Sequence, residues 1–194
     1  MPKFKDPVIN DLAKKYGKIV RKPRLDVFED IVDSIISQQL SVKASATILG
    51  RVQKLFPKNK ITPGLILAIE DLTLRNCGMS WAKARYAKDL ATKTLDGTLQ
   101  LDKLDKMTDQ EVIDHLVLVK GIGCWTAEMI LMFTLVRPDV FPVDDLGIQN
   151  AMSKLYKLNR KTKTFKSKLV KISDKWKPHR TLACWYLWKS LDNA

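Results

Sequence analysis

Two adjacent carboxylates in the stretch Pro142-Val143-Asp144-Asp145 are the residues best placed to do chemistry. They come directly before the segment LGIQNAM, which we expect to be helical. The positive end of a helix dipole stabilises an anion at the N-terminus, so a carboxylate here stays ionised. Such an anion can stabilise a positive charge that develops on a substrate and can orient an attacking water. The alternative role is helix capping alone, for which Asp144 is the better candidate, whereas Asp145 is the better catalyst.

A tight turn with two glycines, Lys120-Gly121-Ile122-Gly123, precedes this pair along the chain. It lies between a short helical segment and an apolar helix that starts at about Cys124. Glycines at this spacing allow a sharp hairpin whose backbone can come close to another surface. The free N–H groups and the dipole at the start of the second helix suit a phosphate group. A plain connection between two helices is the alternative interpretation.

The chain is strongly basic, with 34 Lys and Arg against 21 Asp and Glu and a formal net charge of +13 over 194 residues. A field of this sign attracts polyanions, nucleic acid first among them. The excess is concentrated in residues 157–177, where Asp174 is the only acid. Apolar residues interrupt this segment, which predicts a helix with one cationic face; they are Phe165, Leu169, Val170 and Ile172. A surface that follows a phosphate backbone and a plain solvated face both fit this pattern.

Apolar residues recur at helical spacing through nearly the whole chain, and no segment alternates cleanly over the length of a strand. The prediction is an all-α fold of roughly ten helices in two packed helical halves around a cleft. The polar segment 98–107 is the expected soft boundary between the halves of a single domain that spans residues 1–194. Helix starts are predicted at Asp6, Ser41, Thr62, Ser80 and the capping box of Thr108 and Glu111. Helix ends are predicted at Gly78 and Gly97.

Three widely separated cysteines, Cys77, Cys124 and Cys184, lack CxxC spacing, so neither a disulfide framework nor a zinc site is expected. We interpret them as reduced thiols in the core. The N-terminal residues lack the apolar centre of a signal peptide, and no apolar run has the length of a membrane span. We therefore expect a soluble, monomeric, intracellular protein, in the cytoplasm or nucleoid, or in the nucleus of a eukaryote.

Four motifs resemble, in the same order, those of the helix-hairpin-helix (HhH-GPD) DNA glycosylase superfamily, and above all its 3-methyladenine DNA glycosylase II family. They are SIISQQLSVKASA, GIGCWTAEMILMF, RPDVFPVDDLGI and WKPHRTLACWYLW, within about residues 28–190. The resemblance implies a base excision repair enzyme that flips an alkylated base out of duplex DNA and hydrolyses its N-glycosidic bond. The helix-hairpin-helix motif would occupy about residues 111–136. The chain resembles short members of the family that lack an N-terminal α/β domain.

By this resemblance, the catalytic aspartate of the family falls on Asp145, beside the sugar carbon C1′. Relatives that also cut the strand use a lysine two residues past the last glycine of the hairpin. That position is Trp125 here, and an indole cannot form an imine, so a monofunctional enzyme that leaves an abasic site is implied. With Cys184 as the only cysteine after Cys124, no iron–sulfur cluster is expected, and no cofactor is required.

A base alkylated at a ring nitrogen is cationic, so the enzyme needs an electron-rich pocket more than a strong acid. By resemblance, Trp125 is the first candidate for this pocket. Met129 and His179 stand where relatives place aromatic residues. The other candidates for the pocket lie in the matching motifs, and the aromatic ones among them are more often core; they are Phe141, Trp176, Trp185 and Asp144.

A side chain must fill the gap that a flipped base leaves in the duplex. The resemblance places this wedge at Gln39 or Leu40: alignment on the preceding Gln38 favours Gln39, whereas apolar character favours Leu40. The predicted contacts to DNA lie in this loop and in the hairpin; they are Gln38, Gln39, Leu40, Lys120, Gly121, Gly123 and Thr126.

Hairpins of the family also hold a monovalent cation, Na⁺ or K⁺, through main-chain carbonyl groups. By resemblance, the carbonyls here would be those of Val117, Val119 and Ile122.

Two alternative functions fit the same residues. The first is a helix-hairpin-helix DNA-binding module without catalysis, in which Asp145 is an exchangeable helix cap. The second is a glycosylase for oxidised or mismatched bases that cuts the strand with another amine, such as Lys120 or the N-terminus. Double-stranded DNA is the partner in every case, and binding should weaken with salt because phosphate contacts dominate affinity.

Overall fold

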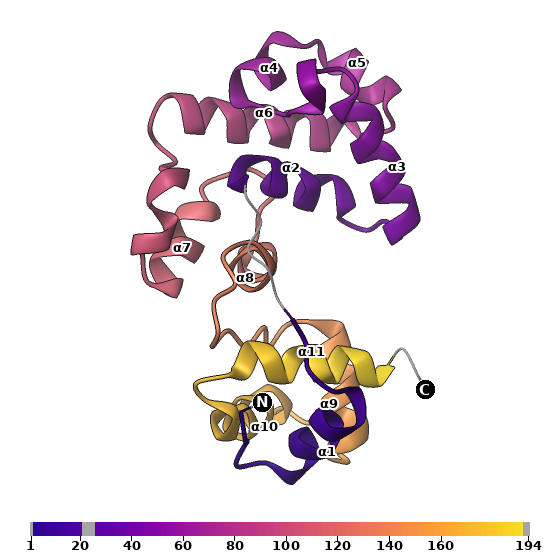
Figure 1. Cartoon of the computed structure of the whole chain (residues 1–194), viewed down its shortest axis with the longest axis vertical. Coiled ribbons are helices and arrows are strands. Elements are labelled where there is room, and N and C mark those ends of the chain that lie inside the picture. The colour runs from indigo at the N-terminus through magenta and orange to yellow at the C-terminus, as the bar shows by residue number, and fades with distance from the viewer. Residues whose placement is uncertain (1, 21–25, 192–194) are drawn as a thin grey trace. The chain divides into compact units, whose positions relative to one another are not determined.

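The computed structural model describes residues 2–20 and 26–191, which fold into eleven α-helices joined by loops, with no β-strand among them (Figure 1). The all-α prediction is therefore confirmed. The helices fall into two compact units. Unit 1 contains the described residues up to 20 and residues 131–191, and unit 2 contains residues 26–130. Within these ranges, no helix is both long and apolar enough to cross a membrane.

Unit 1 has four α-helices: α1 (Pro7–Tyr16), α9 (Leu146–Leu155), α10 (Phe165–Ser173) and α11 (Arg180–Leu191). α11 packs against both α1 and α9, as Figure 1 shows for the yellow helix. Buried residues of α11, Tyr186 and Leu187 among them, make it the central helix of this unit. A short 3-10 turn, Asp174–Trp176, follows α10.

A buried carboxylate, Asp6, joins the N-terminal segment to the rest of unit 1. Its Oδ1 caps α1 by accepting from the backbone N–H of Val8 at 3.0 Å. Its Oδ2 accepts from the Tyr156 hydroxyl at 2.8 Å and from the Trp176 indole at 2.9 Å. Three donors offset the cost of burying this polar group. Burial, and then the hydrogen bond to Asp6, raise the pKa of Tyr156 far above its ordinary value.

Unit 2 holds the other α-helices: α2 (Val27–Ser37), α3 (Val42–Gln53), α4 (Pro63–Ala68), α5 (Asp71–Asn76), α6 (Trp81–Leu95), α7 (Asp109–Leu116) and α8 (Cys124–Met129). α6 is the longest of them, and α2, α4 and α5 all pack against it. α2 also contacts α3, and α7 contacts α8. A π-helical segment, Ile130–Thr134, extends α8 and leads the chain into unit 1.

The predicted cap residues stand at the starts of α1, α3, α4, α6 and α7: Asp6, Ser41, Thr62, Ser80 and Thr108. All but Thr62 accept a backbone N–H of their helix through the side chain. Thr108 and Glu111 form the expected capping box. Gly78 and Gly97 follow α5 and α6 with φ of +109° and +79°, the left-handed conformation in which many helices end.

The chain passes between the units elsewhere than expected, between residues 20 and 26 and again at residues 130–131. The segment 98–107, expected as the soft boundary, lies inside unit 2. Leu99 and Leu104 are the reason, because both are almost completely buried and anchor this polar segment in the core of unit 2. Polar composition alone does not distinguish such a packed surface segment from a linker.

The basic segment 157–177 is helical only in part. Its first residues, 157–164, form a loop, and α10 begins at Phe165. Phe165 and Leu169 are buried, as the helical pattern predicts, whereas Val170 is 42% exposed and lies on the solvent side.

Candidate active site and nucleic-acid interface

The candidate catalytic carboxylate, Asp145, is the N-cap residue of α9 and is buried, with 8% of its surface exposed. Its Oδ1 accepts a hydrogen bond from the backbone N–H of Ile148 at 2.7 Å and another from the indole Nε1 of Trp188 at 2.9 Å. Both donors and the positive end of the α9 dipole stabilise negative charge at this oxygen. The carboxylate is therefore held in one orientation within unit 1.

Aromatic side chains of unit 1 pack around the indole that contacts Asp145. Trp188 stacks on Phe133 with ring centroids 5.7 Å apart, and Trp185 meets Phe133 edge-on at 5.0 Å. Gly147 leaves room for this packing, because a Cβ there would lie 3.0 Å from Trp188 and 3.1 Å from Asp145 Oδ1. A larger residue at position 147 would press on both the indole and the carboxylate.

Of these three aromatic residues, only Trp185 was predicted from the sequence, as a further candidate for the base pocket; Trp188 and Phe133 were not predicted. The signal that could have found Trp188 is its position three residues after Trp185, on the same face of a helix. Its hydrogen bond to Asp145 joins residues 43 positions apart, which local spacing does not reveal.

Asp144 does not cap α9, although sequence analysis considered it the better cap. Its side chain is exposed and forms an ion pair with Lys166 on α10. The cap falls on Asp145 because that residue directly precedes the helix and has the extended backbone of an N-cap, with φ −68° and ψ 122°. The candidate catalyst, Asp145, is therefore also the residue that caps α9.

The loop that leads to Asp145 is fastened to the start of α11. Arg180 donates from Nε and Nη2 to the two carboxylate oxygens of Asp139, at 2.9 Å each. Thr181 donates from its hydroxyl to the carbonyl of Arg137 at 2.7 Å and accepts from a backbone N–H of the same loop at 3.0 Å. A bidentate pair and a bridging hydroxyl thus support the loop from one side.

Among the pocket candidates of unit 1, Trp176 is a core residue. It is fully buried and its indole donates to Asp6, so its burial contradicts the expectation that it binds a base. Phe141 meets Trp176 edge-on at 5.6 Å and is partly exposed. His179 is also partly exposed. The roles of Phe141 and His179 stay predictions.

In unit 2, the hairpin between α7 and α8 depends on Gly121. Its φ is +80°, and a Cβ there would lie 2.1 Å from the ring of Tyr86 on α6. The close approach that Gly121 permits is therefore an approach to another helix of the protein. Gly123 is the N-cap of α8, and among the described residues nothing lies within 4 Å of its Cβ direction. Both glycines are exposed, but only at Gly123 is the Cβ position open.

The turn is also anchored to α6 through Lys120. The backbone N–H of Lys120 donates to Asp89 Oδ2 at 2.8 Å, while its side chain is 75% exposed. Lys93 donates to the other carboxylate oxygen of Asp89 at 2.6 Å. Partial burial raises the pKa of Asp89, but these donors outweigh burial and lower the pKa overall. Asp89 therefore holds the turn as a carboxylate.

The loop with the wedge candidates is bound to both the hairpin and α6. Gln38 donates from Nε2 to the carbonyl of Gly121 at 2.9 Å. Lys83 donates from Nζ to the carbonyls of Ile36 and Gln38, at 2.8 and 2.7 Å, where the end of α2 leaves carbonyls without helical partners. Desolvation by burial lowers the pKa of Lys83. The structure therefore brings the predicted wedge loop and the hairpin together within unit 2.

Both wedge candidates are exposed. Gln39 has a φ of +58°, which is uncommon for a residue with a side chain, and Leu40 is 40% exposed. Backbone strain of this kind clusters at functional sites. The choice between the two side chains stays open.

On α8, Trp125 is 44% exposed and Met129 is partly buried. Thr126 is buried, contrary to its predicted contact with DNA, because it lies on the inward face of the helix. Cys124 is exposed, so the expectation of three core thiols holds only for Cys77 and Cys184.

The proposed cation ligands lie in the same hairpin. Val117 is the C-cap residue of α7, next to carbonyls that the helix leaves without internal partners. The carbonyl of Val119 accepts the N–H of Ile122 at 3.1 Å, which leaves it a second lone pair. Among the side chains of the described ranges, no group of three His, Cys, Asp or Glu is placed to hold a metal ion. A cation here would depend on main-chain oxygens.

The described residues thus combine an all-α fold, a glycine hairpin between two helices and a buried carboxylate that opens a third helix. The chain belongs to the HhH-GPD superfamily of base excision DNA repair proteins, whose family model matches residues 32–178.

Relatives of stated activity support this membership. DNA-3-methyladenine glycosylase 1 of Schizosaccharomyces pombe is 36% identical over 166 residues, which cover 84% of this chain and 72% of that protein. The structure of the S. pombe 3-methyladenine DNA glycosylase Mag1 in complex with abasic DNA matches with a TM-score of 0.86 and 32% identity, over 98% of this chain and 94% of that one. The Bacillus subtilis protein YfjP is 33% identical over 86% of this chain, which spans 59% of its length.

Proposed function

We propose that this protein is a monofunctional DNA glycosylase that hydrolyses the N-glycosidic bond of alkylated purines, such as 3-methyladenine, in duplex DNA. The observation that carries the proposal is Asp145, a buried carboxylate held by two hydrogen-bond donors at the start of α9. Membership of the HhH-GPD superfamily and the activity named for the S. pombe relatives support the substrate class. The site of action is intracellular DNA.

In this mechanism the carboxylate of Asp145 stabilises the positive charge that develops on the sugar as the base departs. The bond between C1′ and the base nitrogen breaks with its electron pair on the base, which neutralises the charge of the alkylated ring. The oxygen of a water molecule then bonds to C1′, and the water releases a proton. Asp145 orients this water and receives the proton, directly or on its way to solvent. The product is an abasic site.

The candidates for base recognition are partly exposed side chains in the matching motifs of each unit. Trp125 is the main candidate, because an exposed indole face attracts a cationic ring. Met129 in unit 2, and Phe141 and His179 in unit 1, are further candidates, each with part of its surface exposed. Trp176 is excluded from the pocket by its burial.

DNA is held in unit 2 by the hairpin and the wedge loop. The backbone of Gly121 and Gly123 and the side chain of Lys120 contact phosphates, and Gln39 or Leu40 fills the space of the flipped base. A monovalent cation bound by the carbonyls of Val117, Val119 and Ile122 would add positive charge on the same side of the turn.

Strand cleavage is not part of the proposed activity. An imine with the exposed sugar needs an amine, and the position after the hairpin is occupied by the indole of Trp125. Borohydride trapping tests this directly: a covalent adduct with DNA would show that another amine, such as that of Lys120, supplies a lyase step.

The central experiment compares the wild type with Asp145→Asn on methylated duplex DNA and measures released bases by chromatography. Asn keeps an Oδ1 that can accept from Ile148 and Trp188, so the variant retains the cap, loses the negative charge and carries an NH2 group in place of Oδ2. We expect the wild type to release 3-methyladenine, and Asp145→Asn to bind duplex DNA with unchanged affinity while its rate falls by orders of magnitude. Equal rates would remove Asp145 from catalysis, and no release by either protein would favour a non-catalytic DNA-binding module or another lesion.

A further inference from the structure

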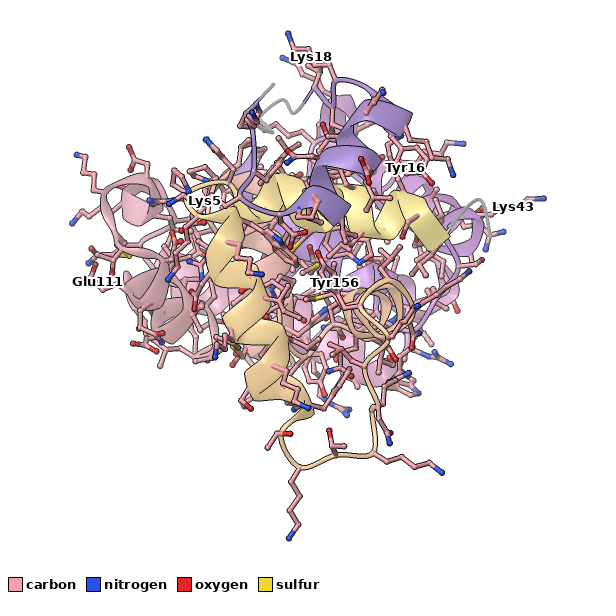
Figure 2. The ribbon with its side chains drawn as sticks, turned by 90° about the horizontal axis from the view of Figure 1, so that it is seen from below. Lys5, Tyr16, Lys18, Lys43, Glu111 and Tyr156 are labelled. Carbon is pink, nitrogen blue, oxygen red and sulfur yellow. The ribbon has the colours of Figure 1, made fainter. Side chains whose placement is uncertain are left out.

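A second basic surface lies in unit 1, outside the hairpin and the wedge loop. Its cations come from the loop after α9, from α10 and from the turn that follows; they are Lys157, Arg160, Lys161, Lys163, Lys166, Lys168, Lys171 and Lys175, here called the α10 surface, and all are exposed. In the part of the chain that the structure describes, Lys166 is the only member with an ion-pair partner. Figure 2 shows the loop between α9 and α10 at the lower edge of the view, with side chains that extend from it into solvent.

The packing of α10 directs its lysines outward. Phe165, Leu169 and Ser173 are buried at four-residue intervals, which is one face of the helix. Lys168 and Lys171 therefore project from the other side of the helix. Residues three positions apart on a helix have their Cβ atoms about 5–6 Å from each other. Lys175 continues this row in the 3-10 turn after α10.

The α10 surface borders the helix that Asp145 opens. Lys166 pairs with Asp144, the neighbour of Asp145 in the chain. Arg160 donates to Asn150 and, at 3.4 Å, to Gln149, both on α9. All of these contacts lie within unit 1. They place the α10 surface beside α9, the helix that begins directly after Asp145.

The chemistry of this surface suits a phosphate backbone better than a protein or a membrane. Exposed cations at this density repel one another, and a polyanion relieves the repulsion. Protein interfaces depend on buried aromatic and apolar anchors, and membrane-surface helices need a wide apolar face. The only large apolar side chain exposed among residues 157–177 of the described structure is Val170.

We propose that the α10 surface binds the sugar-phosphate backbone of duplex DNA, independently of sequence, and extends the DNA interface in unit 1 beyond Asp145. The proposal rests on the proposed function for the identity of the polyanion. It does not depend on whether Asp145 is catalytic.

The test variant carries Lys168→Gln, Lys171→Gln and Lys175→Gln. The matched control carries Lys3→Gln, Lys5→Gln and Lys14→Gln, three exposed lysines of the same unit outside the α10 surface, of which Lys5 is labelled in Figure 2. Binding to a short undamaged duplex is measured over a range of salt concentrations. The slope of log K against log salt is negative, and each lost phosphate contact should reduce its magnitude by about 0.9. The slope of the test variant should therefore be smaller in magnitude by about 2–3, and the variant should bind at least tenfold more weakly at low salt.

A slope equal to that of the wild type, or an equal change in the test variant and the control, would overturn the proposal. Unchanged duplex binding with loss of binding to vesicles of anionic phospholipid would also overturn it, in favour of a membrane surface. Base release by the wild type is measured on the same preparation. Base release with an unchanged salt slope in the test variant would refute only the DNA contact of the α10 surface. A changed salt slope without base release by the wild type would refute only the glycosylase activity.

Discussion

The indole Nε1 of Trp188 donates to Oδ1 of Asp145 at 2.9 Å, and this bond connects α11 to the N-cap of α9. A donor to a carboxylate stabilises its charge and fixes the plane of its two oxygens. We infer that Trp188 is a positioning residue, because it acts on the substrate only through Asp145.

Trp188→Phe should slow base release at saturating enzyme by about 10- to 100-fold, since a hydrogen bond to a charged group contributes roughly 1.5–3 kcal/mol. Affinity for duplex DNA with an abasic site should stay unchanged, because the packing against Phe133 is preserved. Trp185→Phe is the control: in the described structure its Nε1 is buried without a hydrogen-bond partner, so the change removes no bond. Equal losses in both variants would assign the effect to packing.

Gly121→Ala and Gly123→Ala should have different effects, because Gly121 packs against Tyr86 and Gly123 is a candidate contact to DNA. At position 121 the added methyl group meets Tyr86 at a positive φ, so we expect a loss of roughly 2–4 kcal/mol in unfolding free energy. At position 123 nothing in the described structure opposes a methyl group, so the unfolding free energy should fall by less than about 1 kcal/mol, the small preference for glycine over alanine at an N-cap. Weaker duplex binding by Gly123→Ala with no larger loss of stability would identify a backbone that contacts DNA. Denaturant titration measures the unfolding free energy, and a binding isotherm measures the affinity for duplex DNA. Equal destabilisation of the two variants would contradict the different roles of the two glycines.

Lys83→Met should disturb the wedge loop. The ammonium donates to the carbonyls of Ile36 and Gln38, which would lose a charged donor, so we expect a loss of about 1–3 kcal/mol in stability. If the loop fills the duplex during base flipping, release should fall several-fold for a lesion in paired DNA and little for the same lesion in a single strand. Lys88→Met serves as the control, because Lys88 lies on α6 like Lys83 and the change removes only an ion pair with Asp71 of α5. A uniform loss on both substrates would show that the loop is not involved in flipping.

The raised pKa of Tyr156 predicts that the unfolding free energy falls at alkaline pH. Its pKa is raised by burial and by the bond to Asp6, whereas in the unfolded chain the phenol titrates near its ordinary value of about 10. Below that pH both states hold the proton, and above it only the folded state does, so this group lowers stability by about 1.4 kcal/mol per pH unit. Tyr156→Phe should therefore be less stable than the wild type at neutral pH and should lose stability less steeply above pH 10. Parallel curves from denaturant titrations across that range would disprove the assignment.

The local features of the fold could be predicted because they depend on neighbours along the chain. Asp6, Ser41, Ser80 and the Thr108/Glu111 box bond to N–H groups within three residues, so residue type and spacing are sufficient. The hairpin between α7 and α8 and the position of Asp145 at the start of α9 have the same local origin.

Residue types and their spacing are therefore sufficient to predict the all-α class, most helix starts, the hairpin and the acidic residue at the start of α9. The folded structure was needed to show that Trp188 donates to Asp145 and that Trp176 belongs to the core. It was also needed to show that Tyr86 packs against the turn and that Lys83 supports the wedge loop. Leu99 and Leu104 likewise show that a polar segment can be packed rather than free. These contacts join residues that lie far apart in the chain, or depend on which face of a helix is covered. They exist only after complete helices have packed, because hydrophobic burial selects the faces that meet.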